Sequence, residues 1–321
     1  MTDNKGGFKW AEYIFIFSFM VLIVSLSFLA QPFSLFLVTL IPLPILIASY
    51  RHGTLLGGII AALVSAFFAL FLQDASLVIL VISMATVGIG LGNALKENFS
   101  SKKVLIIGIV ASLITVSLLG LGLSLITNQP LLVLYQETTD KIMTEINDRG
   151  VFTQAQIEVV QETLKTLPLL FPSMLITGSI FIAGINFLAG SSVLKRLGED
   201  VVTLPPISQW MFPWWVSLLY VILFPLNMLN TYPLFNIIIQ NLLSVVRWFL
   251  VLQGICIILY FLNSTRMANW FKALILFPIY AFSNWFLVLI GLLDPWLKYR
   301  GRARIYQEEL KKQKENQKKP E

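Results

Sequence analysis

The stretch at residues 40–58, LIPLPILIASYRHGTLLGG, joins two apolar runs through a short basic turn. Pro42 and Pro44 interrupt the first run, and Arg51 and His52 separate it from the second. An apolar run of about 20 residues is long enough to cross the hydrocarbon core of a bilayer as a helix. The stretch therefore predicts two neighbouring membrane helices, the first of them kinked or broken at its prolines.

The composition extends this pattern to the whole chain. Of the 321 residues, 57% are hydrophobic and only 12% are charged, whereas soluble domains carry about 25% charged residues. A bilayer offers no partner for unpaired backbone groups, so a spanning chain must be helical or form a closed barrel, and no alternating barrel pattern is visible. We therefore predict an all-α polytopic transmembrane helical bundle of about eight to ten membrane segments.

The apolar segments expected from the sequence lie at 10–30, 33–50, 54–72, 76–95, 104–127, 169–193, 213–230, 234–263 and 270–293. The first of these is interpreted as a retained span and not as a signal peptide. Its apolar region of about 20 residues exceeds the 7–15 residues that a signal peptide usually has.

The distribution of Lys and Arg predicts the topology. By the positive-inside rule, the basic connectors and the N-terminus face the cytoplasm. The tail beyond Pro295 holds nine basic and four acidic residues, so it is also expected to be cytoplasmic. Nine crossings would separate the two ends, so we expect eight or ten crossings. The segments in question are 234–263, which Arg247 could divide, and 270–293, which Pro278 could break.

The loop at 128–167 is the largest extramembrane element expected before the tail. Apolar residues recur at helical spacing up to Gly150, which ends the first pattern. Thr153 and Gln156 have the spacing of a capping box at the start of a second helix. We expect two amphipathic surface helices, which either cover the ends of membrane helices or form a lid over an outward-facing cavity.

The chain lacks the residues that standard catalytic and metal sites require. It has one histidine, His52, and one cysteine, Cys256, and it contains neither a Walker A nor a dinucleotide-binding pattern. We therefore expect no catalytic residue, no metal site, no cofactor and no enzymatic activity. Nucleic-acid binding is not expected either, because no aromatic platform accompanies the basic residues.

The turn that contains Arg51 and His52 does not require a chemical role for either residue. Gly53 can adopt the left-handed conformation that ends a helix, and cations there favour the carboxyl end of the helix dipole. Broken membrane helices, in contrast, sometimes form transporter sites. Pro42 and Pro44 are therefore better candidates for a substrate-binding element than His52.

Small residues at every fourth position allow helices to pack closely. Gly58, Ala62 and Ala66 form such a series in the third segment, as do Ala61, Ser65 and Ala69. Gly88 and Gly92 have the same spacing in the fourth segment. These residues either pack helices within one bundle or form a docking face for another membrane subunit.

Arg247 is the sharpest single candidate for a substrate contact. A charge at mid-bilayer costs about 2.5–3.5 kcal/mol on insertion scales, so it normally faces a cavity or a partner. Asn236 and Gln240 lie on the same helical face as Arg247, and no Asp or Glu lies deep in an apolar segment to pair with it. The stripe either contacts an anionic or polar solute, or Arg247 snorkels to the interface at a helix break.

Further intramembrane amides either line a pocket or form hydrogen bonds between helices: Asn186, Asn227, Asn230, Gln253 and Asn284. In the tail, basic residues directly after the last segment should attract anionic lipid headgroups: Lys298, Arg300, Arg302 and Arg304.

Four short stretches of the chain match a family pattern: LIPLPILIASYRHG at 40–53, VLKRLGEDVVTLPPISQW at 193–210, LQG at 252–254 and GLLDPWLKYRGR at 291–302. The resemblance itself runs over nearly the whole chain. Together they resemble the YybS-like family of predicted bacterial multi-pass membrane proteins, whose function is not established. That family is in turn distantly similar to the substrate-binding subunits of energy-coupling-factor transporters, which are six-helix membrane proteins. The first segment here lacks the AxxxA-type spacing with which such subunits dock on a coupling subunit.

These features predict three regions: a six-segment bundle at 1–196 that includes the 128–167 loop, C-terminal membrane segments at 197–297, and a basic cytoplasmic tail at 298–321. The leading hypothesis is a transport-related protein of the bacterial cytoplasmic membrane, a binding or permease component for a small solute. The alternative is a non-transporting accessory or scaffold protein that acts through its basic tail and its helix-packing faces.

Overall fold

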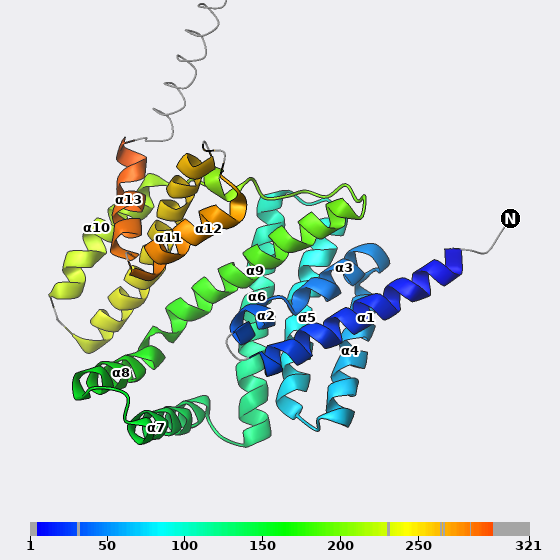
Figure 1. The fold of residues 1–321 in the computed structure, drawn as a ribbon, viewed down its shortest axis with the longest axis horizontal. Helices are drawn as coiled ribbons and strands as arrows, with labels where there is room; N and C mark the ends of the chain where they lie inside the picture. Colours follow the sequence, from blue (N-terminus) through cyan, green and yellow to red (C-terminus); the bar gives the residue numbers. More distant parts are fainter. Residues whose placement is uncertain are drawn as a thin grey trace, which may run out of the picture. The chain divides into compact units, whose positions relative to one another are not determined.

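The computed structural model describes residues 5–30, 33–229, 232–263, 265, 267–282 and 284–297. Within these residues the regular structure is entirely helical, which confirms the all-α prediction. The chain divides into two compact units between Leu204 and Pro205, a few residues beyond the boundary at 196 that was expected from the sequence. Each unit is described by itself (Figure 1).

Unit 1 comprises the helices α1 (Lys5–Leu29), α2 (Ser34–Thr39), α3 (Pro42–His52), α4 (Thr54–Phe71), α5 (Ala75–Lys96), α6 (Ser101–Thr127), α7 (Leu131–Arg149), α8 (Gln154–Thr166), η2 (Leu167–Leu170) and α9 (Phe171–Arg196). The six apolar segments predicted before residue 197 are all helical. The second of them is divided into α2 and α3.

Helix α5 is the centre of unit 1 and packs against α3, α4, α6 and α9. Its glycines permit the closest approach to α3. A Cβ atom on Gly88 would lie 2.6 Å from the carbonyl oxygen of Pro42, and one on Gly92 would lie 2.6 Å from that of Leu46. Distances below 3.0 Å are not tolerated by real side chains, so the α3–α5 contact requires glycine at both positions.

The small-residue series on α4 is placed differently. Ala62 and Ala66 are exposed, and a Cβ atom on Gly58 would meet no atom within 4 Å. The buried stripe of α4 instead contains Gly57, Ala61 and Ser65, one position earlier in each case. The Gly58 series therefore does not pack helices within the described part of unit 1.

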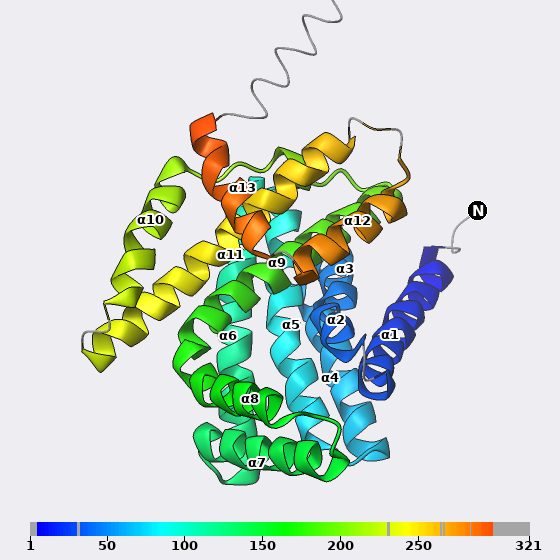
Figure 2. The ribbon, with the colours of Figure 1, turned by 60° about the vertical axis from the view of Figure 1, so that its left-hand side comes forward.

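The loop at 128–167 forms the two helices that the sequence predicts. Helix α7 ends at Gly150, which adopts φ +60°. Thr153 and Gln156 form the capping box, with hydrogen bonds in both directions, at the start of α8. Figure 2 shows α7 and α8 side by side at the far end of α6. Whether they cover helix ends or act as a lid stays a prediction.

Unit 2 comprises η3 (Ile207–Gln209), α10 (Trp214–Met228), α11 (Pro233–Asn263), α12 (Asn269–Phe282) and α13 (Asn284–Leu297). The expectation that Arg247 could divide the 234–263 segment is wrong, because α11 is one continuous helix of 31 residues. At 1.5 Å per residue it is about 46 Å long, so it must tilt in a hydrocarbon core of about 30 Å or extend beyond it.

The 270–293 segment is broken, as expected, but not at Pro278. That proline lies inside α12, and the chain bends by 101° between α12 and α13. In the described part of the chain, seven helices are long and apolar enough to cross a membrane, and the bent α12–α13 pair makes eight if it is one span. Helix α10 is apolar but shorter. The molecule is a polytopic helical membrane protein.

Candidate functional site

The second membrane segment of unit 1, Ser34–His52, counts as one span, but a tight turn at Leu40 and Ile41 interrupts its helix directly before the prolines. Helix α2 ends at Thr39, and α3 begins with Pro42. Pro42 and Pro44 have no N–H to donate to the preceding turn. The chain crosses the break with tighter hydrogen bonds, from Ile41 N to Val38 O at 3.2 Å and from Leu43 N to Leu40 O at 3.0 Å.

Asn186 of α9 closes the break from the side. Its amide nitrogen donates to the carbonyl oxygens of Thr39 at 2.7 Å and of Ile182 at 2.9 Å. Both acceptors are carbonyl oxygens, so the nitrogen must be the atom that faces them. The side chain is fully buried, and its Oδ1 atom has no hydrogen-bond partner. A buried acceptor without a partner costs about 1–3 kcal/mol, so this oxygen is a candidate contact for a bound molecule or a water.

The break lies near the middle of its membrane segment. From Pro42 to Arg51, at the charged end of α3, the helix rises by about 14 Å at 1.5 Å per residue. This is about half of a hydrocarbon core of 30 Å. Transporter sites built from broken helices occupy this depth.

A half-buried charge network closes the end of α3. Arg51 forms ion pairs with Glu12 of α1 and, at 3.2 Å from its Nε atom, with Glu199 of the segment that follows α9. The Nε2 atom of His52 lies 3.3 Å from the same Glu12 oxygen, but without hydrogen-bond geometry. We name Glu12, Arg51, His52 and Glu199 the Arg51 network.

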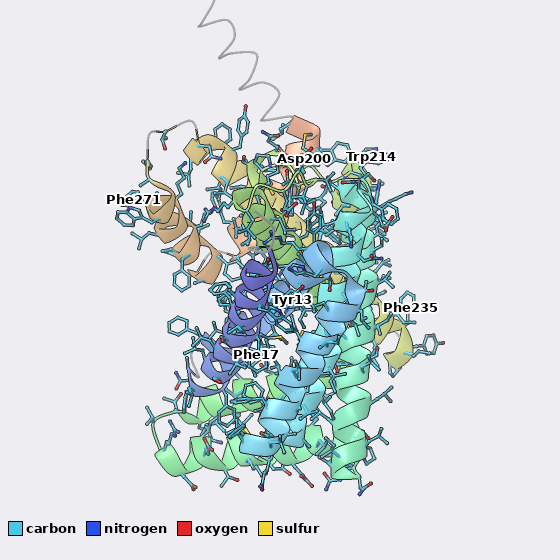
Figure 3. All side chains as sticks on the ribbon, turned by 90° about the vertical axis from the view of Figure 1, so that its right-hand side faces the viewer. Tyr13, Phe17, Asp200, Trp214, Phe235 and Phe271 are labelled. Atoms are coloured by element: carbon cyan, nitrogen blue, oxygen red, sulfur yellow. The ribbon has the colours of Figure 1, made fainter. Side chains whose placement is uncertain are left out.

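Aromatic contacts align α1 with the Arg51 network. The rings of Tyr13 and His52 meet edge to face at 4.8 Å, and Phe17 meets Phe67 of α4 in the same way. Figure 3 shows Tyr13 and Phe17 on α1, next to α3 and α4.

Helix α3 ends at Gly53, as expected, but Gly53 adopts φ +96° and ψ +163° and not the left-handed helical conformation that was expected. From the sequence, Arg51 and His52 at the end of this helix did not indicate that Glu12 and Glu199 would lie beside them, because these carboxylates are far away in the sequence. The only signal was the presence of acidic residues at the basic ends of α1 and α9.

In unit 2, a second polar contact joins three chain segments. The Oε1 atom of Gln253 accepts from the backbone N–H of Phe212 at 3.0 Å, and its amide nitrogen donates to Asp294. Gln253 is 1% exposed and Asp294 is 3% exposed. Asp294 is thus a buried acid that the sequence did not indicate, although it lies just outside the apolar segments. It follows directly after the 270–293 segment, and α13 continues past it and buries it.

Glycines bring α11 and α13 together at the same place. A Cβ atom on Gly254 would lie 2.3 Å from Leu287 O, and one on Gly291 would lie 2.0 Å from Leu250 O. The LQG and GLLDPW motifs thus meet, and each supplies one glycine and one buried polar side chain.

The Arg247 stripe lies on the outside of unit 2. Arg247 and Gln240 are exposed, and Asn236 is half-buried. Among the described residues, no carboxylate lies within ion-pair distance of Arg247. The stripe belongs to unit 2, whereas Pro42 and Pro44 belong to unit 1.

The described pockets include one of about 540 Å³ between α7 and α8. Its lining is mixed: Leu132, Tyr135, Gln136, Thr139, Asp140, Leu164, Lys165 and Pro168. Tyr135 donates a hydrogen bond to Leu164 O and thereby joins the two helices. Half of these residues are exposed and none is buried.

Two further predictions concern other parts of the chain. Lys298, Arg300, Arg302 and Arg304 lie outside the described residues, so lipid binding by the tail stays a prediction. Among the residues that the structure does describe, no three His, Cys, Asp or Glu side chains are grouped so that they could hold a metal ion.

The helical membrane architecture agrees with the family that the chain matches. Residues 18–295 match the model of the family described as "Predicted membrane protein (DUF2232)". The chain belongs to this family of predicted membrane proteins.

A curated relative, "Uncharacterized protein YybS" of Bacillus subtilis (strain 168), is 25% identical over 197 residues, which are 59% of this chain and 62% of the relative. The alignment thus covers less than two thirds of that relative's length. No solved structure matches the chain.

Proposed function

We propose that unit 1 is a solute-binding or permease component of a transport system, and that its solute is small, polar and uncharged. The observation that carries the proposal is the α2–α3 break, where fully buried Asn186 binds the freed Thr39 carbonyl and keeps an unpartnered oxygen. Broken helices expose backbone groups to a ligand in transporters, and an amide oxygen next to such a break would accept a hydrogen bond from a solute.

The expected charge of the solute follows from the interior of unit 1. The buried polar residues described there carry hydroxyl or amide groups only: Ser27, Ser49, Ser65, Ser83, Ser112, Thr115, Ser173, Ser179, Asn186 and Ser191. An ion bound among them would lose its hydration without gaining a counter-charge, which is costly. A neutral solute with hydrogen-bond donors fits this interior better than an anion does.

Matched solute pairs test the proposal. The melting temperature of the purified protein is measured with nicotinamide and nicotinate, uracil and orotate, panthenol and pantothenate, and biotinamide and biotin. At least one neutral member should stabilise the protein, because a ligand that binds only the folded state raises its stability. Asn186→Leu should lose this stabilisation and Ser192→Ala should keep it. No shift with any compound would count against solute binding, and shifts with the acids alone would count against a neutral solute.

The orientation proposed for unit 1 places the turn between α3 and α4 in the bacterial cytoplasm. The Nζ atom of Lys96 lies 3.8 Å from the position of a Cβ atom on Gly53, so Lys96 and Arg51 lie at the same end. This grouping supports a cytoplasmic assignment for that end under the positive-inside rule.

A second candidate function is that of an accessory protein with a membrane partner. It is favoured by the open face of α4, where Ala62, Ala66 and the space around Gly58 are uncovered. It predicts that Gly58→Leu or deletion of 303–321 abolishes function, whereas Asn186→Leu is tolerated. An ATP-driven coupling module that copurifies with the protein would instead favour transport.

A further inference from the structure

The Arg51 network joins three elements that are far apart in the sequence. Glu12 comes from α1, Arg51 and His52 from α3, and Glu199 from the segment after α9. The side chains of the network are 14–32% exposed, so solvent screens them less than it screens surface pairs. Arg51 alone contacts two carboxylates, for which the fork of a guanidinium is suited.

The interior directly behind the network is closed. Ser49, two residues before Arg51, is fully buried, and its hydroxyl has no hydrogen-bond partner. A Cβ atom on Gly57 would lie 2.1 Å from that hydroxyl oxygen, so α3 and α4 are in direct contact there. A molecule that approached the α2–α3 break from this end would have to separate α3 from its neighbours.

We propose that the Arg51 network is a gate: it keeps α3 packed against its neighbours, and a path from this end to the α2–α3 break opens when Arg51 releases its carboxylates. The inference rests on the proposed function, because a gate requires a site behind it. The network differs from a simple brace in one respect. Opening of a gate exposes the buried residues of α3 alone to solvent. Loss of a brace, meaning a network that only stabilises the fold, exposes buried residues throughout unit 1.

Cysteine labelling distinguishes these two roles. The native Cys256 is buried and is replaced in a Cys256→Ser background. Two reporters are then compared, Ser49→Cys on α3 and Ser112→Cys on α6, because both serines are fully buried and lack a hydrogen-bond partner. The labelling rate of each purified protein with a water-soluble maleimide is measured with and without Arg51→Gln.

The gate predicts that Arg51→Gln raises labelling of Ser49→Cys by about tenfold or more, because labelling follows the population of the open form when opening is fast. Ser112→Cys should stay within about twofold of its own rate. The exchange Glu12→Arg with Arg51→Glu should restore part of the protection. Arg149→Gln, in an exposed pair with Glu145, is the control and should change neither reporter.

Two results would overturn the gate. One is unchanged labelling of Ser49→Cys in Arg51→Gln, and the other is an equal rise at both reporters, which identifies a brace. The experiment uses no solute, so its failure is separable from that of the proposed function. If a solute stabilises the protein but Arg51→Gln does not change labelling of Ser49→Cys, only the gate is contradicted. If Arg51→Gln raises that labelling but no solute stabilises the protein, solute binding is contradicted and the network controls only an opening motion.

Discussion

At the scale of single residues, the informative side chains are buried amides. Asn186 and Gln253 each use their amide to join chain segments that the sequence keeps far apart. The sequence marked both residues as amides that either line a pocket or join helices. It could not identify their partners, because the backbone groups that they bind, the Thr39 carbonyl and the Phe212 N–H, would be present whatever residue type stood there.

Gln253→Leu should destabilise the protein by about 1–3 kcal/mol, because it removes one hydrogen bond each from the half-buried Phe212 N–H and the buried Asp294 carboxylate. Gln240→Leu, on the exposed side of the same helix, should change stability by no more than about 0.5 kcal/mol. Unfolding in detergent, followed by circular dichroism, compares the two variants. Equal losses would show that the Gln253 contact contributes nothing specific.

Asp74 gives a prediction for pH. It caps α5 by accepting from Ser76 N at 2.8 Å, and the bond from the Ser76 hydroxyl is the main cause that lowers the pKa of Asp74 below its ordinary value of 3.8. Because the pKa of Asp74 is lower in the folded state, its ionised form stabilises the fold. This stabilisation is complete at pH values above the ordinary pKa and is lost as the pH falls through the lowered pKa of the folded state. Melting temperatures between neutral pH and about pH 3 should therefore fall more steeply for the wild type than for Asp74→Asn. Parallel curves would contradict this role of the cap.

At the scale of elements, the sequence predicted most of the helices correctly and their interruptions less well. Length and hydropathy identify a span locally, and the capping box of α8 is a local signal too. The continuity of α11 through Arg247 was missed, because one charge on an exposed face does not break a helix. The burial of Asp294 was missed because it depends on the approach of α13 to α11, which no local pattern encodes.

The glycine contacts give opposite predictions for two neighbouring helices. Gly92→Ala should destabilise the protein by about 1–3 kcal/mol, because the new methyl group overlaps α3. Gly58→Ala meets open space and should stabilise α4 by about 0.5–1 kcal/mol through helix propensity. Thermal unfolding of the two variants in the same detergent tests the pair. A loss of similar size in both would mean that α4 is packed on its Gly58 face.

At the scale of the whole molecule, two helical units place different chemistry in a membrane. Unit 1 combines a mid-depth break, a neutral interior and a charged closure at one end of α3. Unit 2 buries a carboxylate behind two glycine contacts and carries Arg247 on its surface. The sequence favoured Arg247 as a substrate contact because intramembrane charge is conspicuous, whereas the structure directs attention to Asn186, whose neutral amide gave a weaker signal.

The most direct test of solute binding at the α2–α3 break is titration calorimetry with the neutral compound that gives the largest thermal shift. Asn186→Leu should weaken its binding by tenfold or more, which corresponds to about 1.4 kcal/mol, and Arg247→Ala should bind like the wild type. Unchanged binding in Asn186→Leu together with lost binding in Arg247→Ala would contradict the proposal and place the solute in unit 2.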